Sequence, residues 1–170
     1  MRMPPGFQET LCNLAAILLL LSPAVTESVA ELQSRFDRET DSVRKAKILV
    51  RLGDAQFEEA RRAGKDGDSN TAGFTLEKYR DNVRAALQAL KKQHPDAEKH
   101  SNGYRQLEMH LRNGIREVED TMLAAPAPYK PPLQIVRQDL IAMDEELIKL
   151  LFPRRPSEHH PPTPPPEKQP

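Results

Sequence analysis

The chain has 170 residues, which allows one modest domain with flanking tails. Apolar residues make up 38% and aromatic residues 5%, and Trp is absent. This composition is poor for a packed α/β enzyme and ordinary for a helical protein with long solvated faces. The 25 basic residues balance 25 acidic residues. No net field therefore attracts the whole chain to nucleic acid or to an anionic membrane surface.

The first 30 residues have the pattern of a secretory signal peptide. Arg2 supplies a positive charge, Leu11–Leu21 is an apolar run, and small residues favour a cut after Ala30. A run of 11 residues is too short to span a bilayer, although a retained anchor or a buried helix are the alternatives. Removal would also take away Cys12, the one cysteine. We therefore expect an exported, thiol-free protein in the periplasm, cell envelope or medium, with membrane attachment only if this segment is retained.

The stretch Val43–Ala63 is the most apolar long run outside the N-terminus. Its apolar residues recur at spacings of three and four and cover a wider arc than a surface helix buries. The stretch therefore predicts a helix between two neighbours, capped by Asp41 or Ser42 and ending near Gly64. Gly53 in its interior costs helix stability, which predicts close approach of another helix at this point.

Further apolar stripes with helical spacing predict helices at residues 31–38, 72–93, 103–124 and 132–152. Apolar residues from Leu133 to Leu150 repeat strictly at three and four, which is typical of antiparallel helix packing. This last stripe could close the bundle or pair two chains. No segment alternates with period two. The sequence therefore predicts an all-α domain over residues 31–152, as an antiparallel bundle or hairpin array of four long helices and one short helix.

Proline marks the remaining segments. Ala125–Pro132 is expected to be extended because it is rich in proline. Residues 153–170 are predicted to form a disordered, proline-rich tail with polyproline II character. The tail contains PxxP spacing, which is the pattern of a docking peptide. Because the usual partners of such motifs are absent for an exported bacterial protein, we expect the tail to be a spacer or an envelope-facing tether instead. The paired His159 and His160 reflect the composition of the tail.

The segment Asp66–Glu77 resembles the calcium-binding loop of the EF-hand family. Oxygen-bearing side chains occupy its positions 1, 3, 5 and 12, which are Asp66, Asp68, Asn70 and Glu77. The resemblance implies a calcium-binding protein. Thr71 replaces the turn glycine of the motif, and Gly73 replaces an apolar residue. The simpler interpretation is a helix–helix turn in which Asn70 or Thr71 caps the next helix.

A second resemblance concerns the central helix. Leu52 and Gly53, then Phe57, then Tyr79 on the following helix are similar in order to residues of tetratricopeptide-like helical hairpins. The resemblance implies antiparallel helix pairs with a binding groove. More broadly, the chain resembles small exported helical proteins of bacteria.

The sequence contains no recognisable catalytic pattern, such as a Ser/His/Asp order, HExxH or a glycine-rich phosphate loop. His110 is expected to face solvent, and Asp144, Glu145 and Glu146 to form a solvated face. We therefore predict no catalytic, cofactor-binding or metal-binding residues and no nucleic-acid partner. The expected function is a non-enzymatic module that binds a protein partner or supports an envelope assembly. Calcium binding through Asp66–Glu77 is the alternative, and an enzyme whose pocket is invisible in sequence is a third hypothesis.

Overall fold

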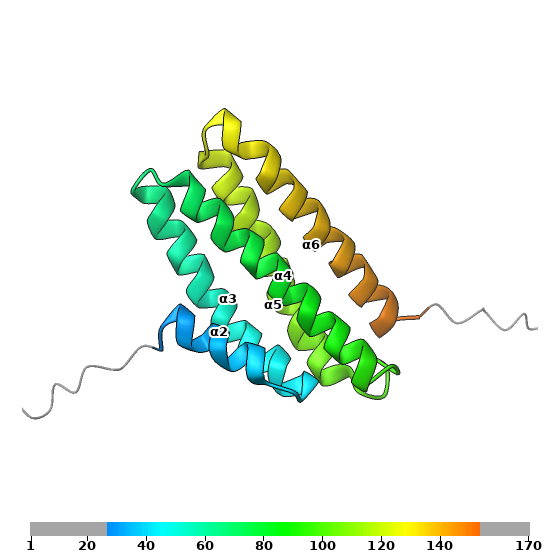
Figure 1. The fold of residues 1–170 in the computed structure, drawn as a ribbon. Coiled ribbons are helices and arrows are strands. Elements are labelled where there is room, and N and C mark those ends of the chain that lie inside the picture. The colour runs from blue at the N-terminus through cyan, green and yellow to red at the C-terminus, as the bar shows by residue number, and fades with distance from the viewer. Residues whose placement is uncertain (1–26, 154–170) are drawn as a thin grey trace, which may run out of the picture.

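The computed structural model describes residues 27–153, and within this range all regular structure is helical, with no strand (Figure 1). The elements are α2 (Val29–Arg38), α3 (Ser42–Lys65), α4 (Ser69–Gln93), α5 (Ser101–Ala124), the 3-10 helix η1 (Ala127–Tyr129) and α6 (Lys130–Leu151). The predicted class, with four long helices and one short helix, is confirmed. The apolar N-terminal run, the paired tail histidines and the proline-rich tail lie outside the described residues.

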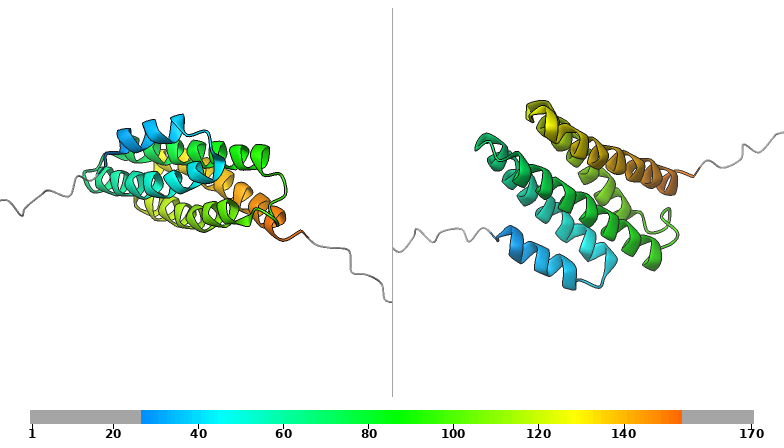
Figure 2. Two further views of the ribbon diagram at one scale, coloured as in Figure 1. Left: turned by 90° about the horizontal axis from the view of Figure 1, so that it is seen from below. Right: turned by 45° about the horizontal axis from the view of Figure 1, so that its top comes forward.

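The four long helices form two antiparallel hairpins, α3–α4 and α5–α6, which lie side by side (Figures 1 and 2). Helix α3 packs against α4, α5 and the short α2, whereas α6 packs against α4 and α5. The first and last long helices share no extended interface. The architecture is therefore a stack of hairpins, and α3 lies between several neighbours as its wide apolar arc predicted.

The stripe on α6 closes the bundle within one chain. Leu133, Leu140 and Leu147 are buried with the interior residues of the other helices. Their 3-4 spacing places them on one face of α6, toward α4 and α5. Of the two possibilities left open by the sequence, packing within the chain is the one observed.

The turn between α3 and α4 has a hydrogen-bonding pattern that explains where α3 stops. The backbone N–H of Asp68 donates to the carbonyl of Ala63 at 2.9 Å, and that of Gly67 donates to Gly64 at 3.2 Å. This is the Schellman pattern, which requires a left-handed residue after the helix. That residue is Gly67, with φ of 78°. The predicted end near Gly64 is one residue short of Lys65, and the glycine that terminates the helix is a different one.

Two glycines in this turn should respond to alanine in opposite directions. Gly67→Ala is expected to lower the free energy of unfolding by about 1 kcal/mol, because a Cβ strains the left-handed conformation. Gly64→Ala should raise it by up to about 1 kcal/mol, because this position is helical and a Cβ there meets no atom within 4 Å. Urea denaturation of both variants checks this pair. Changes of the same sign would contradict the assignment of Gly67 as the terminating residue.

Two local predictions were wrong. Ala125–Pro132 is not extended throughout, because Ala127–Tyr129 forms η1 and α6 already begins at Lys130. The last two prolines of this segment lie in the first turn of α6, where a missing N–H breaks no helical hydrogen bond. Helix α4 begins at Ser69 and is capped by Asp68, and not by Asn70 or Thr71.

Candidate binding groove between α3 and α5

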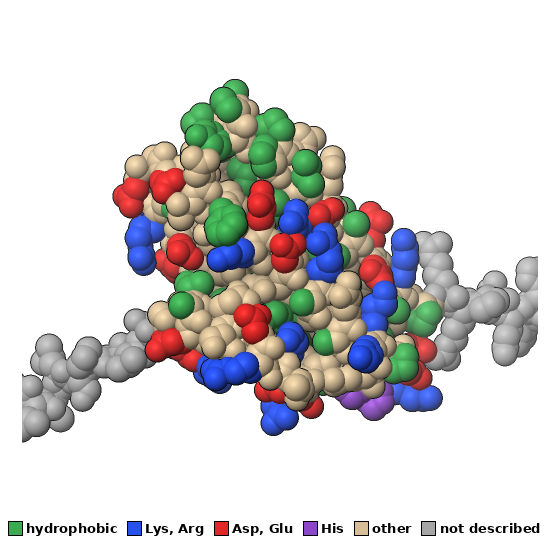
Figure 3. Space-filling model, in the orientation of Figure 1, with side chains coloured by type: hydrophobic (Ala, Val, Ile, Leu, Met, Phe, Trp, Pro, Cys, Tyr) green, Lys and Arg blue, Asp and Glu red, His purple; other side chains and the backbone are tan. Residues whose placement is uncertain are grey.

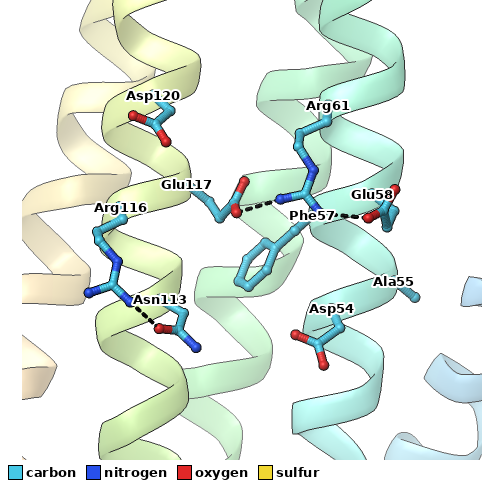
Figure 4. Close-up of a pocket in the computed structure, with 9 residues that line it drawn as sticks. All are labelled: Asp54, Ala55, Phe57, Glu58, Arg61, Asn113, Arg116, Glu117 and Asp120. Carbon is cyan, nitrogen blue, oxygen red and sulfur yellow. Dashed lines mark hydrogen bonds and ion pairs between the residues drawn. The ribbon is translucent and has the colours of Figure 1, made fainter.

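A groove of about 530 Å³ runs along the surface between α3 and α5 (Figure 4). Helix α3 contributes Asp54, Ala55, Phe57, Glu58 and Arg61, and α5 contributes Asn113, Arg116, Glu117 and Asp120. Most of these residues lie on the successive turns of two helices that face each other across the groove. Charged groups therefore line both walls.

Arg61 links the two walls of the groove. Its guanidinium donates to Glu58 at 2.7 Å on its own helix and to Glu117 at 2.5 Å on α5. The bond to Glu58 is the main reason that the pKa of Arg61 is raised above its ordinary value. Arg116 donates to the side-chain oxygen of Asn113. Arg61, Glu58 and Glu117 thus pair with one another, whereas Arg116 is bound only to a neutral amide.

Two carboxylates of the groove are not bound to a lysine or arginine. The Asp120 side chain is exposed and makes no hydrogen bond or ion pair with any residue in the described range 27–153. Asp54 contacts only His110, with 3.3 Å between Oδ1 and Nε2. Asp54 and Asp120 lie at opposite ends of the groove in Figure 4. The groove therefore has a carboxylate without a lysine or arginine partner at each end, and Arg116 between them is bound only to an amide.

The charged groove continues into an apolar pocket of about 310 Å³ at the end of the bundle where α3 and α5 terminate. Arg61, Glu117 and Asp120 line both cavities. The other lining residues are mostly small or apolar, namely Ala60, Gly64, Lys65, Ser69, Ala72, Thr121, Ala124, Ala125 and Leu133. The two cavities form one surface feature with a polar part and an apolar part, which we call the α3–α5 groove.

A buried polar cluster lies behind the Asp54 end of the α3–α5 groove. His110 is only 4% exposed, so the prediction of a solvent-facing histidine was wrong. Its Nδ1 lies 3.0 Å from the hydroxyl of Tyr79, which also lies 3.2 Å from the His110 carbonyl oxygen. Gly53 and Gly114 make room for these rings, because a Cβ at either position would lie 2.2 Å from a ring carbon. The predicted close approach at Gly53 is confirmed, and the approaching groups are side chains.

This cluster can satisfy both protonation states of His110. In the neutral state, Nε2–H donates to Asp54 and Nδ1 accepts from the Tyr79 hydroxyl. In the protonated state, Nδ1–H donates to the Tyr79 oxygen, and the hydroxyl hydrogen turns to the His110 carbonyl. Burial lowers the pKa of His110, and the Asp54 carboxylate partly opposes this shift. Tyr79 is completely buried, so its hydroxyl is not presented to a ligand in the groove.

The buried histidine should make stability depend on pH. Because its folded pKa lies below the ordinary value of 6.5, the unfolded chain binds more protons in this range. The free energy of unfolding is therefore expected to fall as the pH drops below about 6.5. Urea titrations between pH 5 and 7.5 measure this slope. His110→Gln should remove its histidine-dependent part, whereas His100→Gln, at an exposed position, should retain it. An unchanged slope in His110→Gln would contradict this prediction.

The four side chains of the calcium-like segment do not converge. Asp66 ends α3, and Asp68 caps α4 by accepting from the backbone N–H and the hydroxyl of Thr71 at 3.0 and 2.7 Å. Glu77 lies nine residues beyond Asp68, all of them in α4, which separates the two by about 13 Å along the helix axis. Across residues 27–153, no group of three or more His, Cys, Asp or Glu side chains is arranged to hold a metal ion.

The acidic residues of α6 differ from one another in environment. Glu145 is exposed, as expected, whereas the Asp144 side chain is 17% exposed and lies 3.9 Å from the Arg112 guanidinium. Burial raises the pKa of Asp144 above its ordinary value. The prediction of a uniformly solvated face was therefore wrong for Asp144. Nothing in its surroundings adds a nucleophile, so this residue belongs to the α5–α6 interface.

Three residues of the tetratricopeptide-like resemblance, Gly53, Phe57 and Tyr79, lie together. The rings of Phe57 and Tyr79 are 4.7 Å apart in an edge-on arrangement beside Gly53.

Comparison with known proteins finds no match to any family model, curated protein or solved structure. Among the helices of residues 27–153, none combines the length and apolarity that crossing a membrane would require.

Proposed function

We propose that this protein is a non-enzymatic protein-interaction module and that the α3–α5 groove receives a segment of its partner. The observation that carries the proposal is the continuity of a charged groove with an apolar pocket, both formed mainly by α3 and α5. A binding surface of this kind can anchor apolar side chains in the pocket and orient the rest of a segment by its charges.

The side chains behind the groove support a binding role over a catalytic one. His110 and Tyr79 lie behind the groove, and both are buried and bonded to each other. A general acid or base has to reach the proton that it transfers. These two groups instead fix the separation of α3, α4 and α5, and so hold the walls of the groove in place.

Gly64 provides a direct test of the groove. It is exposed, lines the apolar pocket and has open space around its missing Cβ, so Gly64→Leu fills the pocket without disturbing the core. Gly73→Leu is the matched control, because Gly73 is also helical and sterically free but lines none of the described cavities. Peptides selected from a random displayed library on the purified chain should lose at least tenfold in affinity with Gly64→Leu and keep it with Gly73→Leu.

One result with the selected peptides would contradict the proposed binding surface. Selected peptides that bind the Gly64→Leu variant as tightly as the unmodified chain would show that the α3–α5 groove is not the binding surface. Circular dichroism melts of both leucine variants provide the folding control. Because each replaces a helical glycine, both melts are expected to occur at or above the original temperature.

We also propose that the chain is exported. The contacts at the start of α2 indicate where the signal peptide of the chain would be cleaved. Ser28 caps α2 and forms a capping box with Glu31, and Glu27 pairs with Arg35 at 2.6 Å and with Arg51 at 2.7 Å. A cut after Ala30 would remove these contacts.

A cut after Ala24, which places small residues at both required positions directly behind the apolar run, would retain these contacts. The intact mass of the exported protein checks this assignment. A mature chain that begins at Glu31 would contradict it, and a mass that includes Met1 would show that the segment is retained.

A further inference from the structure

We propose that His94 and His100 together bind a divalent transition-metal ion, with Cu²⁺ preferred over Zn²⁺. One nitrogen of each imidazole ring is a ligand, and water completes the coordination. The site lies in the connection between α4 and α5 and uses no residue of the α3–α5 groove. It therefore stands apart from the proposed function.

The separation of the two rings matches shared coordination of one ion. An imidazole nitrogen lies about 2.0–2.1 Å from a bound Zn²⁺, which puts the centre of its ring about 3.2 Å from the ion. Two rings at an angle of about 90–110° around the ion then have centres about 4.5–5.2 Å apart. The ring centres of His94 and His100 are 4.8 Å apart, with 36° between the ring planes. The chain therefore already holds the two rings at the distance that a common ion requires.

The ring nitrogens of both residues are available to a ligand. Neither imidazole forms a hydrogen bond or an ion pair with any residue between positions 27 and 153. His100 is exposed and His94 is partly exposed, and Figure 3 shows histidine side chains at the surface along the lower edge of the molecule. His110 differs, because both of its ring nitrogens contact other side chains. Imidazole nitrogen is the commonest metal ligand in proteins, so the exposed pair has the chemistry that a metal site needs.

Hydrogen bonds fix the backbone on both sides of the pair. The carbonyl of His94 accepts from the Tyr104 hydroxyl at 2.8 Å. The backbone N–H of His100 donates to the Asp96 carbonyl at 3.1 Å, and the N–H of Lys99 donates to the Asp96 carboxylate at 3.1 Å. A preformed site loses little conformational freedom when it binds. The separation of six positions matches no helical ligand spacing, so the pair arises only from the fold of the connection and the sequence pattern predicted no metal-binding residue here.

The charges around the connection balance one another. Lys99 pairs with Asp96, and Lys91 pairs with Glu146 of α6. The remaining charged residues within positions 91–100 are one lysine and one glutamate. Net charge therefore neither attracts nor repels a cation strongly, and the choice of metal follows from the ligands.

The donor set selects the kind of metal. Two imidazole nitrogens suit Cu²⁺, Ni²⁺ and Zn²⁺, whereas Ca²⁺ and Mg²⁺ require oxygen ligands. For the same ligands, Cu²⁺ binds more tightly than Zn²⁺. No third His, Cys, Asp or Glu joins the pair among the residues that the structure describes. The ion is therefore expected to exchange with solution, unlike a structural zinc ion held by four protein ligands.

Isothermal titration calorimetry with Cu²⁺, Zn²⁺ and Mg²⁺ tests the site on the full chain. The tail histidines His159 and His160 are first replaced by glutamine, so that they do not supply a second pair of ligands. This parent protein should bind one Cu²⁺ per chain, Zn²⁺ more weakly, and Mg²⁺ not at all. His94→Gln and His100→Gln should each weaken Cu²⁺ binding at least about tenfold, because the second ligand no longer binds within the same molecule.

The control is His110→Gln in the same parent, which removes a buried imidazole and should leave the affinity for Cu²⁺ unchanged. Neither ring of the pair has a partner within residues 27–153, so His94→Gln and His100→Gln should melt like the parent. A parent that binds no Cu²⁺, or an affinity that neither substitution lowers, would overturn the proposal. A loss with only one of the two substitutions would show binding by a single histidine, and shared coordination would be wrong.

Discussion

Gly114→Ala is expected to lower the free energy of unfolding by about 1–3 kcal/mol. An ideal Cβ at this position would lie 2.2 Å from Cε1 of Tyr79 and 2.6 Å from its hydroxyl oxygen. Tyr79 is completely buried, so its ring cannot move into solvent to relieve the overlap. Replacing a helical glycine with alanine otherwise stabilises a protein by about 1 kcal/mol. A net loss of stability in Gly114→Ala would therefore show that the overlap with Tyr79 costs more than this gain. Urea denaturation monitored by circular dichroism measures the change.

Matched glycines provide the control for Gly114→Ala. Gly73→Ala changes the same atoms in a helix, yet its Cβ meets nothing within 4 Å, so this variant should be more stable than the original. A second test uses Tyr79→Phe, which removes the hydroxyl contact from the overlap. The double variant Gly114→Ala/Tyr79→Phe should be destabilised by less than the sum of the single changes. A neutral or stabilising Gly114→Ala would contradict the packing of Tyr79 between α3 and α5.

Tyr79→Phe alone is expected to lower the free energy of unfolding by about 1–3 kcal/mol. The change keeps the ring, which packs against Phe57, and deletes the hydroxyl that binds Nδ1 of His110 at 3.0 Å. His110 would then keep a buried ring nitrogen without a partner, and an unsatisfied buried group costs more than an average hydrogen bond is worth.

Tyr104→Phe is the control for this hydroxyl. Tyr104 also has no exposed surface overall, but its hydroxyl donates at 2.8 Å to the backbone carbonyl of His94 in a partly buried site. Water can replace that donor, so the loss should be smaller, about 0.5–1.5 kcal/mol. Equal losses for the two tyrosines would show that the His110 cluster adds nothing beyond an ordinary hydrogen bond.

Periodic burial explains why the fold could be predicted. The stripes on α4, α5 and α6 repeat at three and four, and residues such as Leu76, Leu107 and Leu140 are buried as that spacing requires. Turn chemistry was harder to predict, because four consecutive residues, Asp68 to Thr71, are all of types that cap helices. Which of them caps α4 depends on the Schellman turn that precedes it, and this turn depends on the backbone of Gly67.

The buried cluster and the groove could not be predicted from single-helix stripes. His110 lies beside the main stripe of α5, and it is buried because α5 contacts three long helices and not two. One signal was available: His110, Gly114 and Glu117 follow one another at spacings of four and three. The small residue in this row, Gly114, leaves room for the ring of Tyr79 on α4. The pairing of Glu117 with Arg61 spans 56 positions and has no local signature.

Helices α3 and α6 share no extended interface, and we expect them to differ in how readily they unfold locally. Helix α6 packs less extensively on the other helices than α3, which is also covered by α2, and segments with fewer packing contacts open first. Amide hydrogens of α6 should therefore exchange with solvent before those of α3. Leu133 on α6 completes the apolar pocket, whereas the charged part of the groove uses only α3 and α5. Local opening of α6 would thus remove one wall of the apolar pocket, while the charged part of the groove stays formed. The rate at which a bound segment is released would then depend on the rate at which α6 opens.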